Sequence, residues 1–231
     1  MTLSAVGERL DGVRNRIGEA AERAGRDPAG VQLIAVSKGF GSHEIRAAMD
    51  AGQLDFGENR VQELLGKYEQ VQGVRWHFVG RLQRNKVAKL VQVSQIIHSI
   101  DSAELAKEVG KRATSQVEVL LEVNVSGEHR KGGVAPSDLP ALVETVLQTQ
   151  HLDLIGLMTM APRVSDPELV RPVFRRLAEL RAQMEERYSY SRIHHLSMGM
   201  SQDYRVAVEE GSTMVRVGEA IFGPRTRFTE R

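Results

Sequence analysis

A short apolar run followed by an amphipathic segment recurs along this sequence, and this repeat constrains the fold more than any other feature. Each amphipathic segment has apolar residues three and four positions apart, as on one face of a helix. The apolar runs, which we predict to be strands, lie at residues 31–38, 54–57, 75–79, 95–100, 117–125, 154–160, 193–197 and 214–217. The helical segments lie at residues 42–51, 59–70, 83–91, 101–113, 137–150, 167–187 and 201–210, with a short turn of helix after Gly218. Strands that alternate with helices indicate parallel strands joined by helical crossovers.

The number of these units favours a closed barrel. Eight strand–helix units in 231 residues fit a single (β/α)8 TIM-type barrel, with residues 1–231 as one domain. A further helix is predicted at residues 3–24, ahead of the first strand, because its apolar residues also form one stripe. An open, doubly wound sheet is the alternative, since counting the units does not separate the two.

The composition excludes several classes of protein. Lys and Arg total 31 against 30 Asp and Glu, so the sequence predicts no general attraction to nucleic acid or to anionic lipid. The absence of cysteine excludes disulfides and thiolate metal sites, and we expect no metal site. The N-terminal segment carries frequent charges and no apolar core of a signal peptide, and no apolar run could span a bilayer. We therefore expect a cytoplasmic protein that does not bind membranes.

Polar residues follow most of the apolar runs directly. In a barrel, the side chains at the carboxyl ends of the strands form the site. Read in order, these residues are Lys38, Glu58, Asn59, His77, Ser99, Asn124, Thr159, Ser197, Arg216 and Gly218.

Lys38 is the candidate with the most distinctive chemistry. A lysine at the end of an apolar strand can extend to solvent at the rim of the barrel. Alternatively, partial burial favours its neutral amine, which attacks aldehydes. The residues alone leave both interpretations open.

Two glycine-containing turns near the C-terminus predict a phosphate site. Residues 196–201 close the seventh strand and are expected to open a helix at Ser201, and residues 215–223 contain a second such turn at Gly218. Backbone N–H groups at helix starts bind phosphate, and in barrels the loops after strands seven and eight commonly do so. Gly199 and Gly218 can also be ordinary turn residues. The presence of two such turns in the expected places favours the phosphate site.

Arg216 lies within the eighth predicted strand. An unpaired charge is unfavourable in the apolar layer between strands and helices, so we expect its side chain to point into the barrel. A guanidinium only donates hydrogen bonds, and a ring nitrogen that faces it must therefore be unprotonated.

Taken together, these segments resemble the pyridoxal phosphate homeostasis protein family, whose members are similar to the N-terminal barrel of alanine racemase. The resemblance spans nearly the whole sequence in the right order. The matching segments are residues 35–38, 56–59 with 62–63, 76–80 with 82–83 and 85–86, 99–101, 156–162, 196–201 with Asp203, and 215–218 with 220–223.

The resemblance implies a fold-type III barrel that holds pyridoxal 5′-phosphate (PLP) as an internal aldimine on Lys38. It implies that Arg216 faces the pyridine nitrogen and that Ser201, Gly218 and Glu219 hold the phosphate, the last two through backbone N–H groups. It also implies that Asn59, His77, Ser197 and Met198 line the pocket. Members of the family are thought to buffer or deliver PLP, with PLP-dependent apo-enzymes as recipients, and have no assigned turnover reaction. We expect a monomer.

The sequence departs from the family pattern at two places. Gly39-Phe40 stands where the family has Thr or Val and then a Lys-Pro pair, which predicts a looser loop over the cofactor. Arg60 replaces an aromatic residue, so a stacking role there is in doubt. Lys131 matches a lysine that the family keeps, and it is a candidate second aldehyde acceptor.

Three functions are therefore compared. The first is a PLP carrier and regulator. We favour it because the sequence lacks the β-rich domain of the racemases and because an arginine facing the ring nitrogen weakens the cofactor as an electron sink. The second is a PLP-dependent amino-acid racemase or decarboxylase that uses His77 or Ser197 as proton carrier. The third is an aldolase-type Schiff-base barrel without PLP.

Overall fold

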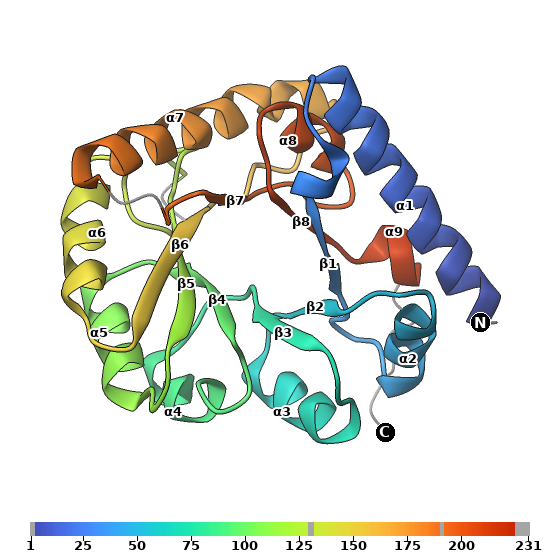
Figure 1. Cartoon of the computed structure of the whole chain (residues 1–231), viewed down its shortest axis with the longest axis horizontal. Coiled ribbons are helices and arrows are strands. Elements are labelled where there is room, and N and C mark those ends of the chain that lie inside the picture. The colour runs from blue at the N-terminus through green and yellow to red at the C-terminus, as the bar shows by residue number, and fades with distance from the viewer. Residues whose placement is uncertain (1–2, 129–131, 190–191, 225–231) are drawn as a thin grey trace.

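The sheet closes into a barrel. A computed structural model describes residues 3–128, 132–189 and 192–224 of the protein. Each strand pairs in parallel with the next, and the eighth pairs with the first. Figure 1 looks along the barrel, with the strands as an inner ring and the helices outside it. The predicted (β/α)8 barrel is confirmed, and the open sheet is excluded because the pairing of the first and last strands leaves no free edge.

The observed strands agree with the predicted apolar runs to within a few residues. The first strand ends at Val36, two residues earlier than predicted. Lys38 therefore lies two residues beyond the end of its strand. The strands are β1 (Gln32–Val36), β2 (Asp55–Glu58), β3 (Arg75–Phe78), β4 (Ile96–Ile100), β5 (Val117–Glu122), β6 (Leu152–Met158), β7 (His195–Ser197) and β8 (Met214–Val217).

The extra N-terminal helix is present and packs against α2, α8 and α9 on the outside of the barrel. The helices are α1 (Leu3–Arg23), α2 (Ser42–Asp50), α3 (Val61–Gln70), α4 (Val87–Leu90), α5 (Ala103–Arg112), α6 (Leu139–Gln148), α7 (Arg171–Tyr188), α8 (Tyr204–Glu209) and α9 (Glu219–Phe222). Short 3₁₀ turns at Arg84–Lys86 and Pro167–Val170 replace the first turns predicted for α4 and α7.

The prediction that a helix opens at Ser201 is wrong. Helix α8 begins only at Tyr204, because the backbone of Asp203 is not helical (φ −129°, ψ 2°) and its carboxylate accepts the Met200 N–H at 2.6 Å. This side-chain bond closes a turn before the helix. The segment that contains Ser201 is therefore a loop.

Two apolar layers follow from the period-two pattern of the strands. Alternate side chains point outward to the helices, where Trp76, Phe78 and Phe174 are buried. The others point into the barrel and form a second, smaller cluster of Ile34, Ile96, Leu120, Ile155, Met158 and Met214. The polar side chains of His77, His98 and Ser197 are also fully buried. Buried polar groups need hydrogen-bond partners, so we expect these side chains to form hydrogen bonds inside the barrel.

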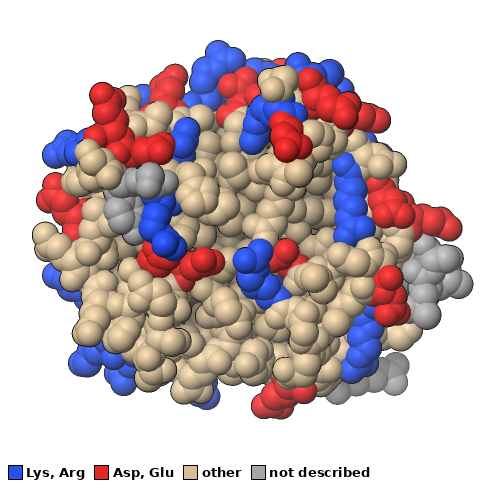
Figure 2. Space-filling model, viewed as in Figure 1, with Lys and Arg blue, Asp and Glu red and all other residues tan. Residues whose placement is uncertain are grey.

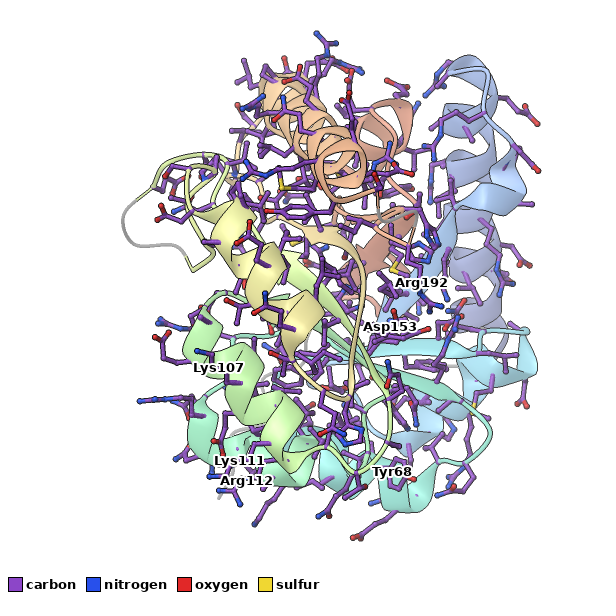
Figure 3. All side chains as sticks on the ribbon, turned by 60° about the vertical axis from the view of Figure 1, so that its left-hand side comes forward. Tyr68, Lys107, Lys111, Arg112, Asp153 and Arg192 are labelled. Atoms are coloured by element: carbon purple, nitrogen blue, oxygen red, sulfur yellow. The ribbon has the colours of Figure 1, made fainter. Side chains whose placement is uncertain are left out.

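Charges of both signs share the surface. On the face in Figure 2, basic and acidic side chains are interspersed around the rim. Figure 3 shows Lys107, Lys111 and Arg112 projecting from α5 away from the barrel. Among the described residues, no helix combines the length and hydropathy needed to cross a bilayer.

Candidate functional site

One large cavity opens among the loops that follow the strands. Its volume is about 870 Å³, and it is lined by residues from the carboxyl ends of seven strands, β4 excepted. Seven of the predicted site residues line it: Lys38, Asn59, Asn124, Ser201, Arg216, Gly218 and Glu219. Residues as far apart in sequence as Lys38 and Glu219 therefore meet at one site.

The backbone on both sides of Lys38 is held by hydrogen bonds. The carbonyl of Ser37 accepts a hydrogen bond from Lys67 Nζ at 2.8 Å, and the N–H of Gly39 donates to Glu63 Oε1 at 2.5 Å. Gly39 itself has a φ of +80°, a conformation that glycine adopts without strain. The loop that was predicted to be loose is thus anchored at both neighbours of the lysine.

These anchors belong to a buried ionic group, the Lys67 cluster, formed by Lys67, Glu58, Glu63 and Ser37. Lys67 Nζ lies 2.5 Å from Glu58 Oε1 and 2.9 Å from Glu63 Oε1, and the Ser37 hydroxyl donates to Glu58 Oε1 at 2.6 Å. The second oxygen of Glu58, Oε2, is buried and has no hydrogen-bond partner among the described residues. Burial raises the pKa of Glu58, and Lys67 offsets this only in part. Sequence reasoning did not identify Lys67, which lies on α3.

Asn59 presents an unpaired acceptor at the cavity. Its side-chain Oδ1 is buried and has no hydrogen-bond partner in the described part of the protein. Its backbone lies against Gly80, where an added Cβ would stand 2.3 Å from the Asn59 carbonyl oxygen. Since buried acceptors are nearly always paired in folded proteins, Asn59 is suited to receive a ligand donor.

The predicted phosphate site is built from two loops. The Ser201 hydroxyl oxygen lies 3.4 Å from the backbone N of Gly218 and 3.5 Å from that of Ala220, at the start of α9. Position 218 requires glycine, because a Cβ there would approach the Val36 carbonyl oxygen to 2.8 Å. The hydroxyl and the N–H groups of this turn form a donor set suited to an anion.

Arg216 points into the barrel and is 5% exposed. Its guanidinium donates to Ser197 Oγ at 2.5 Å and to the Thr159 carbonyl at 2.9 Å. Burial lowers the pKa of Arg216 to about 10, against the opposing effects of Asp203 and Glu122. The guanidinium therefore remains charged at neutral pH at the floor of the cavity.

Three residues predicted to line the pocket do not line this cavity. The His77 ring lies deeper in the barrel, bonded to Asp55 and His98. The Ser197 hydroxyl lies beneath Arg216, to which it is bonded. Met198, one residue beyond β7, is fully buried in the outer apolar layer, because successive side chains alternate and that of Ser197 points into the barrel.

Glu122 lines the cavity, whereas Arg60 lies outside it. Glu122, at the end of β5, lines the cavity and was not predicted, and burial raises its pKa. In the sequence it lies inside the predicted strand at 117–125, and only the structure shows that the strand ends there. Arg60 is exposed just before α3 and does not line the cavity. Lys131, the candidate second acceptor, lies outside the described residues.

Known proteins of one family are similar to this chain over nearly its full length. The family model described as the alanine racemase N-terminal domain matches residues 9–226. A pyridoxal phosphate homeostasis protein of Aquifex aeolicus (strain VF5) is 47% identical over 223 residues, which cover 94% of this chain and 97% of that protein. Another of Pseudomonas aeruginosa is 41% identical over 228 residues, with coverages of 96% and 97%. The structure of PipY of Synechococcus elongatus PCC7942 with PLP bound is 35% identical, with a TM-score of 0.84, and covers 94% of this chain and 100% of that one.

Proposed function

Because this chain belongs to the pyridoxal phosphate homeostasis protein family, we propose that it binds PLP in the cavity, covalently through Lys38, and serves as a carrier and regulator of PLP. One observation carries the proposal: an amine, a buried guanidinium and an anion-binding turn, at Lys38, Arg216 and Ser201 with Gly218, line the same cavity. PLP has an aldehyde, a ring nitrogen and a phosphate, which are the three groups that such residues bind.

The residues fit this ligand in detail. Lys38 Nζ would attack the aldehyde carbon and form a Schiff base, with release of one water. Ser201 Oγ and the N–H groups of Gly218 and Glu219 would hold the phosphate. The unpaired Asn59 Oδ1 would accept a hydrogen bond from a ligand hydroxyl.

Arg216 favours binding over turnover. When bound, PLP supplies an electron sink for carbanions at an amino-acid substrate. A charged guanidinium donates to a ring nitrogen and leaves it unprotonated, which weakens that sink. We propose PLP-dependent apo-enzymes as the recipients of the cofactor. We also expect the protein to be a monomer and to be located in the cytoplasm.

The two proton carriers proposed for the racemase or decarboxylase alternative do not reach the cavity. Neither His77 nor Ser197 lines the cavity, and both side chains are engaged in hydrogen bonds inside the barrel. Incubation with a panel of L- and D-amino acids tests this point. Steady turnover at about 1 per second or faster, as in ordinary enzymes, would contradict the carrier function.

Absorbance spectroscopy tests the role of Lys38. Purified protein incubated with PLP and then desalted should keep the visible band of a Schiff base, and Lys38→Ala should lose it. Lys107→Ala, which removes an exposed amine on α5 (Figure 3), is the control and should keep the band. Borohydride reduction followed by peptide mass spectrometry should find the label on Lys38. A band of undiminished intensity in Lys38→Ala would refute the assignment, and the absence of a band in the unaltered protein would favour the aldolase-type alternative.

A further inference from the structure

A continuous series of hydrogen bonds crosses the barrel interior from Arg216 to Asp55. Arg216 Nη1 lies 2.5 Å from Ser197 Oγ, which lies 2.8 Å from His98 Nδ1. His98 Nε2 lies 2.9 Å from His77 Nδ1, and His77 Nε2 lies 3.0 Å from Asp55 Oδ1. These five residues come from β8, β7, β4, β3 and β2, and we call them the interior network.

The two ends of the interior network determine its direction. A guanidinium can only donate, and an ionised carboxylate can only accept. Asp55 therefore accepts from His77 Nε2–H, and because a neutral imidazole carries a single proton, His77 Nδ1 accepts from His98 Nε2–H. His98 Nδ1 in turn accepts from the Ser197 hydroxyl, which itself accepts from Arg216. Every donor has one acceptor, and both histidines are neutral in one defined tautomer.

The charges around the network are consistent with this arrangement. Burial lowers the pKa of His77, against the opposing effect of Asp55, and lowers that of His98 well below its usual value. Burial alone would raise the pKa of Asp55, but hydrogen bonds from His77, Arg75 and Gln32 lower it overall. Asp55 thus stays ionised and keeps its acceptor role.

The ends of the network lie at opposite ends of the barrel. Arg216 lines the large cavity, whereas Asp55 lines a second cavity of about 360 Å³ near α1 and the starts of β1 and β2. The three residues between them are fully buried. The orientation of a guanidinium at the ligand site is therefore linked by hydrogen bonds to a carboxylate at the other end.

We propose that Asp55, His77, His98 and Ser197 are positioning residues that orient the Arg216 guanidinium toward the ligand. Ser197 and the Thr159 carbonyl each take one N–H, which sets the plane of the guanidinium and leaves its other N–H groups for the cavity. The inference rests on the proposed function only for the identity of the ligand that Arg216 meets.

The ligand-free protein provides the first test. Nitrogen-15 NMR should show His77 and His98 neutral at pH 7, each with its proton on Nε2. The guanidinium of Arg216 should give separate, slowly exchanging Nη–H signals. A proton on Nδ1 of His98, or a cationic His98, would overturn the direction of the network.

Variants of His98 test the positioning. His98→Leu removes both hydrogen bonds, whereas an amide oxygen and nitrogen in His98→Gln can replace the acceptor and the donor. We expect His98→Leu to lose the slowly exchanging Arg216 signals and to weaken PLP binding about tenfold, which corresponds to about 1.4 kcal/mol. His98→Gln should restore most of both. Ser197→Ala, a smaller change, should reproduce the loss of the Arg216 signals.

His195→Leu is the matched control. His195 is a partly buried histidine on β7, bonded to Thr213 rather than to the network, and its replacement should leave the Arg216 signals unchanged. Unchanged Arg216 signals in folded His98→Leu and Ser197→Ala would refute the inference, as would a His98→Gln variant no better than His98→Leu. If the unaltered protein does not bind PLP, the proposed function fails, but the signals of the ligand-free protein still decide the positioning.

Discussion

The two charged groups at the cavity are supported in opposite ways. The loop of Lys38 is held by the Lys67 cluster, in which an ammonium and two carboxylates lie together. Arg216 is held by hydrogen bonds to neutral groups, the Ser197 hydroxyl and the Thr159 carbonyl, while the carboxylates of Asp203 and Glu122 supply nearby negative charge without bonding to it. Breaking an ion pair strands a buried charge, whereas breaking a neutral hydrogen bond strands only a polar group. The comparison therefore predicts different sensitivities on the two sides of one site.

Lys67→Met should have the largest effect on stability. It removes the cation from the fully buried Glu58 carboxylate, and losing one partner of a buried pair costs about 3–5 kcal/mol. Urea unfolding followed by circular dichroism measures the change. Lys107→Met, on the exposed face of α5, should stay within about 0.5 kcal/mol. A loss below about 1 kcal/mol for Lys67→Met would show that the two regions do not differ in this way.

Ser197→Ala should have a smaller effect on stability. It leaves His98 Nδ1 and one Arg216 N–H without their buried partner, for which we expect a loss of about 1–3 kcal/mol. The same urea experiment measures it. A loss as large as that of Lys67→Met would mean that the neutral region is no more tolerant than the charged one.

The interior network should also make stability depend on pH. His77 and His98 have pKa values lowered in the folded protein, so below the ordinary value of about 6.5 the unfolded chain binds more protons. Stability is then fully present above pH 6.5 and is lost as pH falls below it, by at most about 1.4 kcal/mol per pH unit for each histidine. His98→Gln should reduce this slope between pH 6.5 and 5. An unchanged pH dependence of stability in His98→Gln would show that groups other than His98 cause it.

Arg60→Ala should have the smallest effect. The side chain is exposed and lies outside the cavity, so we expect stability to change by less than about 0.5 kcal/mol. PLP titration should give an affinity close to that of the unaltered protein. A large loss of affinity would show that this position contacts the ligand in solution.

Much of the cavity could be predicted because its residues follow apolar strands directly. Lys38, Asn59, Arg216 and Gly218 were identified by their place at strand ends, and all four line the cavity. Lys67 was missed because it lies on a helix and looks like an ordinary surface residue until α3 is packed against β2. His98 gave a detectable signal, since a histidine between apolar residues of a strand indicates a buried polar group.

The sequence by itself determined the alternation of strands and helices, the polar residues at the strand ends and the glycines where the backbone turns. These features depend on local periodicity and local sterics, which neighbouring residues encode. Only the tertiary structure decided that β8 closes onto β1 and that His98 meets Ser197, 99 positions away. Such contacts depend on the register of strands around the barrel, and that register is set by the packing of the whole chain.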